Sequence, residues 1–251
     1  DGTFATKVDY TTGSIPRSIT ASDVNGDGKL DMLVANYSSN TASIFINTST
    51  STFSFASKVD YTTGTAPYSI TTSDVNGDGK PDMLVANSSS NTASVLINNG
   101  DGTFAAKVDY TTGTQPTSIT SSDVNSDGKP DMLVTNRLSV SASVFLNNGD
   151  GTFVARVNYT TGTNPWSIAT SDVDGDGKPD MLVANFNSST ASIFLNTSTS
   201  TLSSTPGNTQ VTTTYTTPPD TDITSVLILR STSAITDSPV DGTTYATGTV
   251  I

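Results

Sequence analysis

The chain has 251 residues, of which 33% are hydrophobic, and it carries a formal net charge of −12. All 23 acidic residues are aspartates, and the chain contains no cysteine and no histidine. These absences exclude thiol nucleophiles, Ser-His-Asp triads, His-ligated zinc and haem. An acidic chain with 11 basic residues offers no electrostatic surface for nucleic acid, which we therefore exclude as a partner. No apolar stretch approaches the roughly 18 residues of a transmembrane helix, so no membrane span is predicted.

A block of residues recurs four times along the first 196 positions. Its most regular part is a loop with the sequence Asp-Val-Asn-Gly-Asp-Gly-Lys or a close variant of it. The loop begins at Asp23, Asp74, Asp123 and Asp172, at spacings of 51, 49 and 49 residues. Self-similarity at a nearly fixed period is the signature of a repeat architecture, so we expect four copies of one structural unit.

Each block contains four short runs that are compatible with β-strands. In the first block they lie at 17–23, 31–36, 42–47 and 55–61, separated by Gly, Asn and Asp residues that are typical of turns. Four strands in a repeat of about 40–50 residues is the size of a propeller blade, whereas a β-sandwich does not repeat internally in this way. We therefore predict an all-β fold in which four repeats form the four-stranded blades of a β-propeller.

The predicted propeller covers residues 1–196. Its four repeats lie at about 11–61, 62–110, 111–159 and 160–196. Two arrangements remain open for residues 1–10, which begin in the middle of the repeating pattern. Either further blades precede this sequence, or the four blades close on themselves and 1–10 is the closing strand of the last one.

Two stretches of the second block carry a family resemblance. Residues 74–87 read Asp-Val-Asn-Gly-Asp-Gly-Lys-Pro-Asp-Met-Leu-Val-Ala-Asn, and residues 99–104 read Asn-Gly-Asp-Gly-Thr-Phe. These motifs resemble the FG-GAP/VCBS repeat family, which includes the propeller of integrin α-subunits and many bacterial surface proteins and lectins. The resemblance covers residues 1–196, and its motif occurs four times in phase. It implies a propeller, commonly of seven blades, with calcium in the hairpin that joins the first two strands of a blade.

Each loop places oxygen-bearing side chains at alternate positions, which is an arrangement that suits Ca²⁺. Counted from its first Asp, a loop offers side-chain oxygens at positions 1, 3, 5 and 9 and the backbone carbonyl of a Lys at position 7. A Gly at position 6 permits the sharp turn. We predict one Ca²⁺ ion in each repeat. The predicted ligands are Asp23, Asn25, Asp27, Lys29, Asp31, Asp74, Asn76, Asp78, Lys80, Asp82, Asp123, Asn125, Asp127, Lys129, Asp131, Asp172, Asp174, Asp176, Lys178 and Asp180.

The same loop pattern allows two other interpretations, an EF-hand and a set of metal-free turns. An EF-hand needs Glu at position 12, but that position is a Val in every loop and lies in a β-compatible run. A helix-loop-helix structure is therefore excluded. The Asp at position 9 is predicted to complete the metal shell in place of that Glu. The second alternative is a set of metal-free turns. Turns alone do not require carboxylates at positions 1, 5 and 9, which repel one another unless a cation neutralises them. The fourth loop, in which Asp174 replaces Asn, is predicted to bind calcium most tightly, and the third differs by Ser126.

The side chains that differ most between the repeats define a candidate ligand face. They follow a Pro at the start of each block or lie in the loop between its second and third strands, and both places belong to the face opposite the metal loops. The candidate residues are Arg17, Tyr68, Trp166, Tyr37, Arg137 and Phe186. Aromatic and Arg side chains on one face suit stacking on sugar rings or anchoring of a protein. The alternative is drift at unconstrained loop positions, or aromatics that fill gaps between blades.

The C-terminal part of the chain follows a different pattern. Residues 197–222 are rich in Thr, Ser and Pro and are predicted to be a linker. Residues 223–251 resemble the opening of fibronectin-type-III-like modules, which implies a partial β-sandwich-like segment. So short a segment cannot bury a core of its own, so it must pair with other strands, and self-association through it would build a filament.

The function predicted from these features is a non-enzymatic, calcium-stabilised structural or adhesive module of a secreted, cell-surface, matrix or filament protein. Structural ions suit blades that bury little apolar surface, because a ligand of the native state stabilises it. The alternative is a lectin-like, carbohydrate-binding propeller, and the partners are then glycans or surface proteins. A catalytic module is disfavoured because the chain has no His, Cys or Glu, and its clustered aspartates recur in every repeat.

Overall fold

The computed structural model describes residues 1–198. The chain divides into two compact units, of which the first comprises residues 1–174 and 178–201, and the description below covers residues 1–198. The predicted fibronectin-like segment at 223–251 and nearly all of the predicted linker at 197–222 lie outside the described residues. Within residues 1–198, no helix is long and apolar enough to cross a membrane.

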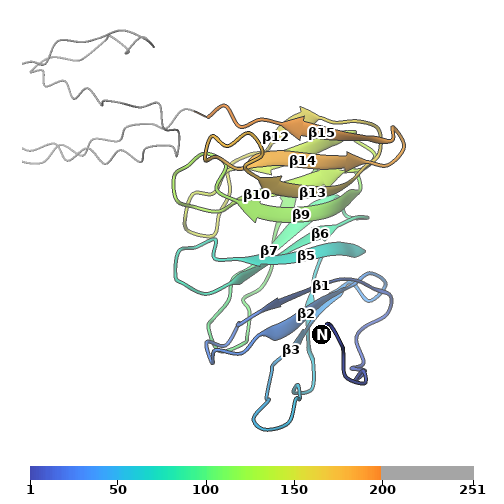
Figure 1. Cartoon of the computed structure of the whole chain (residues 1–251), viewed down its shortest axis with the longest axis vertical. Coiled ribbons are helices and arrows are strands. Elements are labelled where there is room, and N and C mark those ends of the chain that lie inside the picture. The colour runs from blue at the N-terminus through green and yellow to red at the C-terminus, as the bar shows by residue number, and fades with distance from the viewer. Residues whose placement is uncertain (199–251) are drawn as a thin grey trace, which may run out of the picture. The chain divides into compact units, whose positions relative to one another are not determined.

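The described residues form fifteen β-strands in four antiparallel sheets, and within each sheet neighbouring strands follow chain order (Figure 1). The first sheet contains β1 (Pro16–Ser22), β2 (Asp31–Asn36), β3 (Thr41–Phe45) and β4 (Val59–Thr62). The second contains β5 (Pro67–Ser73), β6 (Asp82–Asn87), β7 (Thr92–Leu96) and β8 (Val108–Thr111). The third contains β9 (Pro116–Ser122), β10 (Asp131–Asn136), β11 (Ser141–Phe145) and β12 (Val157–Thr160), and the fourth β13 (Pro165–Ser171), β14 (Asp180–Asn185) and β15 (Thr190–Phe194). These up-and-down sheets confirm the predicted blades.

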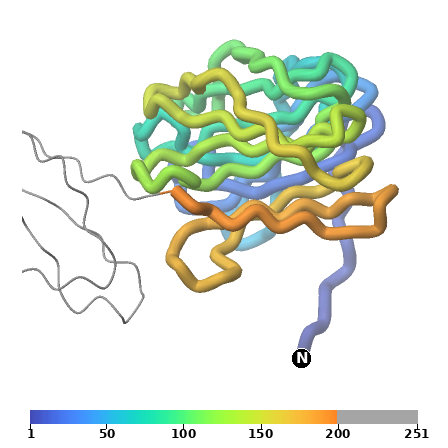
Figure 2. Tube along the Cα trace, turned by 90° about the horizontal axis from the view of Figure 1, so that it is seen from above, coloured from blue at the N-terminus to red at the C-terminus, as the bar shows by residue number. Residues whose placement is uncertain are grey.

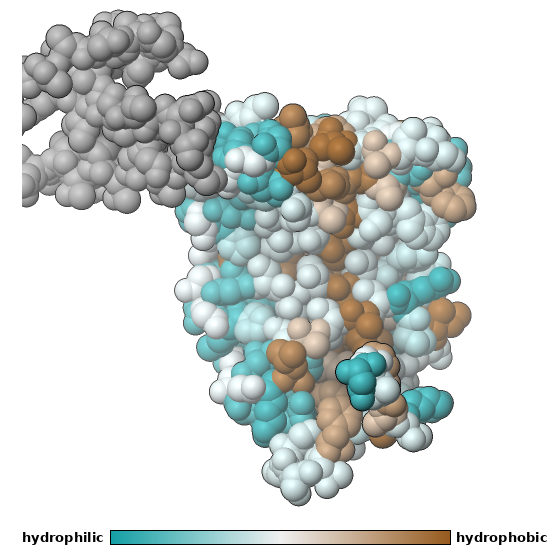
Figure 3. All heavy atoms as spheres, in the orientation of Figure 1, coloured by the Kyte–Doolittle hydropathy of each residue, from teal (hydrophilic) through white to brown (hydrophobic). Residues whose placement is uncertain are grey.

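The hydrophobic core lies between adjacent blades rather than within one of them. Innermost strands β1, β5, β9 and β13 pack side by side, and hydrophobic residues gather along the face that they form (Figures 1 and 3). Because side chains alternate along a strand, Met83 and Val85 join the cluster shared with the first blade, whereas Leu84 and Ala86 join the cluster shared with the third. A middle strand covered on both faces needs a continuous apolar run, which explains the repeated Met-Leu-Val sequence.

The fourth predicted run of each block differs from the structure. The expected strand at 55–61 is interrupted: Phe55 forms an isolated bridge with Asn47, and regular pairing resumes only at Val59 in β4. Aromatic packing accounts for the fixed position of the bridge residue, since the Phe55 ring meets Tyr10 at a centroid distance of 5.2 Å in an edge-to-face arrangement. Packing of the Phe55 ring therefore fixes the position of the isolated bridge, and regular strand pairing begins four residues later, at Val59.

Residues 1–10 form no strand in this structure, and the described part of the fourth blade contains three strands. The N-terminal segment projects away from the body of sheets (Figure 2). Tyr10 packs instead against the first blade, where its hydroxyl accepts a hydrogen bond of 3.3 Å from the Phe55 backbone. Tyr61, at the same place in the next repeat, makes the same bond to Phe104 of the following blade. Tyr10 therefore holds the place that the last strand of a preceding blade fills elsewhere in the chain.

Candidate metal loops and ligand face

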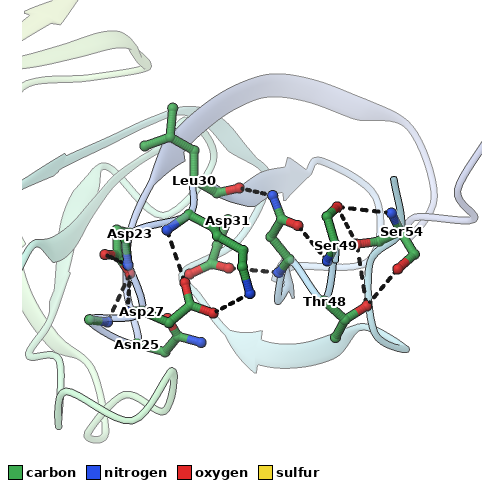
Figure 4. A network of polar contacts seen from close by, with 12 residues as sticks. Asp23, Asn25, Asp27, Leu30, Asp31, Thr48, Ser49 and Ser54 are labelled. Carbon is green, nitrogen blue, oxygen red and sulfur yellow. Dashed lines mark hydrogen bonds and ion pairs between the residues drawn. The ribbon is translucent and has the colours of Figure 1, made fainter. Parts of the chain in front are cut away.

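The first metal loop, 23–31, is held by hydrogen bonds from its own backbone to its acidic side chains (Figure 4). The Asp27 backbone N–H donates both to Asp23 Oδ1 at 3.2 Å and to Asn25 Oδ1 at 3.1 Å. Because these two oxygens approach the same N–H group, the side chains at positions 1 and 3 converge on one point. Gly26 and Gly28 have φ values of 75° and 82°, a region that glycine reaches without strain.

The next two loops reproduce this arrangement. Asp78 donates its N–H to Asp74 Oδ1 and Asn76 Oδ1, both at 3.1 Å. Asp127 donates its N–H in the same way to Asp123 Oδ1 and Asn125 Oδ1, again at 3.1 Å. The third loop differs because Ser126, rather than a glycine, holds the left-handed position, with φ at 61°. The loop conformation thus recurs with the repeat, and Ser126 is strained because a residue with a side chain rarely adopts this φ.

The fourth loop brings three carboxylates together. Oxygens of Asp172, Asp174 and Asp176 all lie within 4.8 Å of one another. Within residues 1–198, this is the one place where three acidic groups converge in this way. Such proximity is costly for negative charges without a cation, and hard carboxylate oxygens are the ligands that Ca²⁺ prefers. The side chains at positions 1, 3 and 5 therefore fit a calcium ion, and the loops remain predicted metal sites.

The Asp at position 9 has a structural role that the sequence did not reveal. Asp31 is buried, and its two oxygens accept hydrogen bonds from the backbone N–H groups of Val24 at 2.9 Å and Asn47 at 2.7 Å (Figure 4). Burial, which disfavours the charged form, raises the pKa of the equivalent Asp82 and Asp131. These carboxylates tie the metal loop to the end of the third strand. Their predicted role as metal ligands stays a prediction.

The ammonium group of the Lys at position 7 lies beside the carboxylate at position 5, while its side chain stays partly exposed. The Lys29 ammonium is 3.3 Å from Asp27, and the Lys80 ammonium is 3.4 Å from Asp78. A hydrogen bond from the Lys29 backbone N–H lowers the pKa of Asp27, and the neighbouring ammonium acts in the same direction. Each such lysine supplies one positive charge to a loop that carries several negative ones.

An Asn after the third strand, which the sequence analysis did not single out, joins each metal loop to the next blade. The buried Asn98 donates its amide to the carbonyl of Val24 in the preceding loop, at 3.0 Å, and to the carbonyl of Pro81, also at 3.0 Å. Asn147 and Asn196 make the same contacts one and two blades further on. An Asn recurs at this position in every repeat, and this recurrence is the sequence signal that could have identified it.

The ligand face is shaped by a backbone feature that precedes each repeated Pro. The residue before that Pro has a positive φ in every block, namely Ile15, Ala66, Gln115 and Asn164, with values between 52° and 62°. Such a conformation is rare for a residue with a side chain, and it costs energy. It aims the carbonyl of Asn164 at the Phe186 N–H, 2.9 Å away. The turn therefore brings the residue after Pro next to the loop between strands two and three.

The structure places the six candidate ligand-face residues in one continuous cluster. Four aromatic rings form a row, with centroid distances of 6.1 Å from Tyr37 to Tyr68, 5.9 Å from Tyr68 to Trp166 and 5.8 Å from Trp166 to Phe186. The guanidinium of Arg17 lies 5.1 Å from the centre of the Tyr37 ring. These distances are typical of aromatic and cation–π contacts. We refer to these six residues as the aromatic face.

The aromatic face joins residues from all four blades. Tyr68 of the second blade reaches Trp166 of the fourth because the third blade has a small residue, Thr117, at the equivalent position. Arg137 of the third blade lies 5.2 Å above the Trp166 ring and donates a hydrogen bond of 2.6 Å to Asn164. Packing between blades accounts for part of this contact, but Trp166 and Phe186 remain 38% and 71% exposed.

Several solved structures of low sequence identity are similar to part of this chain. BBS1N in its complex with ARL6DN has a TM-score of 0.50 and 14% identity, covering 72% of this chain and 58% of that one. An Agrocybe aegerita lectin that recognises terminal N-acetylglucosamine has a TM-score of 0.47 and 20% identity, over 70% and 51% of the two chains. Virginiamycin B lyase from Staphylococcus aureus has a TM-score of 0.46 and 14% identity, over 72% and 55%. The chain thus spans little more than half the length of these proteins, and likeness at this identity concerns the fold alone.

The family follows from the repeat itself. No curated protein matches the sequence. The model of the FG-GAP-like repeat matches residues 23–85, 74–134 and 123–183, which together cover more than half of the chain. Each match begins at one metal loop and ends in the strand that follows the next metal loop. The family model therefore covers the same elements that the structure repeats. The chain belongs to the FG-GAP-like repeat family.

Proposed function

We propose that this chain is a calcium-stabilised, non-enzymatic propeller module of an extracellular structural or adhesive protein, of the cell-surface, matrix or filament type. The observation that carries the proposal is the convergence of hard oxygen donors in every metal loop, with three carboxylates within 4.8 Å in the fourth. Calcium is favoured over magnesium because loops of protein oxygens suit the larger ion.

The ions have a structural role in this proposal because the metal loops belong to the blade interfaces. Val24 of the first loop accepts hydrogen bonds from Asn98 and from the Gly102 backbone of the second blade. An ion that fixes the loop also fixes this carbonyl, so binding to the native state stabilises the contact between blades. Four blades that bury their apolar residues mainly against each other gain directly from firmer interfaces.

An extracellular location is supported by the type of site. FG-GAP repeats are typical of extracellular proteins, and this chain belongs to the FG-GAP-like repeat family. The loops are largely exposed, and exposed loops suit the weak calcium sites of extracellular modules, with dissociation constants of about 10⁻⁴–10⁻³ M. Such sites fill only where calcium is abundant.

Thermal unfolding tests the calcium part of this proposal. The chain is expected to unfold at a higher temperature in excess calcium than in EGTA, because binding restricted to the folded state adds RT ln(1 + [Ca²⁺]/Kd) per site. Magnesium at the same concentration is the control and should shift the midpoint less. Equal midpoints in EGTA and in saturating calcium would rule out calcium stabilisation.

A second candidate function is carbohydrate binding, and the aromatic face favours it. Its rings present apolar surface beside polar groups, which is the combination that binding a sugar ring requires. Trp166 and Phe186 are the most accessible of these rings, at 38% and 71% exposure. A glycan array probed with the labelled protein tests this function, and Trp166→Ala is expected to abolish any signal.

A further inference from the structure

The two arginines of the aromatic face differ in their surroundings from the six lysines that form ion pairs in the described chain. Within residues 1–198, neither Arg17 nor Arg137 lies within ion-pair distance of a carboxylate. Six lysines instead each pair with an Asp two residues away: Lys7, Lys29, Lys58, Lys80, Lys107 and Lys129. A chain with a net charge of −12 thus keeps two guanidiniums without a carboxylate partner on one face.

Aromatic rings and amides hold both guanidiniums in place. Arg17 lies 5.1 Å from the centre of the Tyr37 ring and 5.3 Å from that of Tyr68. Arg137 lies 5.2 Å from the centre of the Trp166 ring, and its Nε donates to Asn164 Oδ1 at 2.6 Å. A planar guanidinium stacked on rings loses little further freedom when it binds an anion, and its N–H fork matches the geometry of carboxylate and sulfate oxygens.

The surroundings of the aromatic face are rich in neutral polar groups. Exposed residues of the loops between strands two and three include Ser38, Ser89 and Asn187. Asp9 lines a hollow beside Arg17, but its carboxylate is bonded to Lys7. Hydroxyl and amide groups can donate and accept hydrogen bonds, as the hydroxyls of a sugar do. A ligand that suits this face therefore combines an apolar ring surface, many hydroxyls and negative charge.

We infer that the aromatic face binds an acidic polysaccharide, whose sugar rings pack on Trp166 and Phe186 while sulfate or carboxylate groups bind Arg17 and Arg137. The inference rests on the second candidate function and adds the charge of the ligand to it. Charge complementarity supports this inference. An acidic sugar supplies carboxylate or sulfate partners for the guanidiniums of Arg17 and Arg137, and a neutral sugar does not. The metal loops lie on the face opposite the aromatic face and take no part in this binding.

Tryptophan fluorescence provides a specific readout, because Trp166 is the one tryptophan of the chain. The protein, with calcium saturating, is titrated with dextran sulfate, with hyaluronan and with neutral dextran. Dextran sulfate and dextran share a backbone and differ in charge, and hyaluronan offers carboxylates in place of sulfates. We expect a saturable change in emission with one or both acidic polymers and none with dextran. Binding should weaken as ionic strength rises, because salt screens exposed charges.

Paired arginine variants separate a specific site from general attraction to polyanions. Arg17→Gln combined with Arg137→Gln should weaken binding of the acidic polymer about tenfold or more, since both charged hydrogen-bonding groups are lost. Arg156→Gln is the matched control. Arg156 lies outside the aromatic face, where it bonds to Asn158 and to the Thr111 carbonyl, so this variant should bind within about twofold of the parent.

The outcomes distinguish the inference from the function on which it rests. Binding of dextran as tightly as dextran sulfate would overturn the inference and leave carbohydrate binding standing. Equal losses in Arg156→Gln and in the double variant would also overturn it, because attraction would then be diffuse. Failure of the protein to bind any polysaccharide, in these titrations and on the glycan array, would overturn both. Circular dichroism melts of each variant confirm that the compared proteins are folded.

Discussion

The side-chain amide of Asn98 in the second blade donates a hydrogen bond of 3.0 Å to the backbone carbonyl of Val24 in the first metal loop. The N–H of the same Val24 donates to the buried Asp31 at 2.9 Å. Both polar groups of one loop residue are thereby satisfied, one within its own blade and one by the next. The metal loop and the blade interface are therefore parts of one hydrogen-bonded unit.

Replacing Asn98 by Ala should destabilise the protein by about 2–3 kcal/mol. The substitution removes the hydrogen bonds that the buried Asn98 amide donates to the carbonyls of Val24 and Pro81. Urea unfolding measures the loss. Asn99→Ala is the control, because Asn99 is exposed and its side chain bonds only to Thr103, and it should cost less than about 0.5 kcal/mol. Equal costs for the two variants would show that the contact between blades contributes little.

The strained position in the third loop predicts a stabilising substitution. Ser126 has a φ of 61°, and the equivalent Gly77 has 75°. Ser126→Gly should stabilise the protein by about 0.5–1 kcal/mol, because glycine adopts this conformation without a steric penalty. Gly77→Ser should have the opposite effect of similar size. Thermal unfolding of the two variants under the same calcium concentration checks the prediction, and a shift of the same sign in both would contradict it.

The number of carboxylates in a loop should set its calcium affinity. Asp174→Asn is expected to weaken the fourth site about tenfold, and Asn25→Asp should strengthen the first by a similar factor, because affinity rises with ligand charge. Isothermal titration calorimetry of the chelator-treated protein measures both. Asp101→Asn lies in a turn outside the metal loops and should leave the titration unchanged. Affinities that do not respond to either loop substitution would exclude these side chains as ligands.

Close packing of a glycine against a buried amide predicts a large effect at another site. A Cβ atom at Gly113 would lie 2.6 Å from Cγ of Asn136, whose amide bonds to Ser141 and Ser143. Gly113→Ala should therefore cost about 1–3 kcal/mol, since the buried network cannot move aside. The neighbouring Thr114 is exposed, and Thr114→Ala should be nearly neutral. Denaturant unfolding compares the two, and a neutral Gly113→Ala would contradict the packing described here.

Much of the fold could be predicted because the repeat carries it locally. The strand predicted at 31–36 is β2, since Met-Leu-Val between turn residues fixes both its ends. The gathering of Tyr68 and Trp166 on one face could be expected from the period of the repeat, and the structure places their rings 5.9 Å apart. Whether that face binds a ligand stays a prediction.

The parts that the sequence did not reveal depend on contacts between distant residues. The position of Asp31 in the loop predicts a metal ligand, whereas its bond to the Asn47 backbone could not be predicted because it requires the third strand to end beside it. The left-handed conformation of Gln115 before Pro runs against local preference and is imposed by tertiary contacts, including its N–H bond to Asn91 of the preceding blade. The hydrogen bond of Asp31 and the left-handed conformation of Gln115 both depend on the positions of neighbouring elements in the fold rather than on residue type.

Native mass spectrometry tests the central claim most directly, because it counts the ions bound to each folded chain. After chelator treatment and exchange into calcium at about 10 mM, the intact protein should retain four Ca²⁺ ions, one per metal loop. A variant with Ala in place of Asp23, Asn25 and Asp27 should retain three. A parent protein that binds no calcium, and a loop variant that binds as many ions as the parent, would each contradict this account.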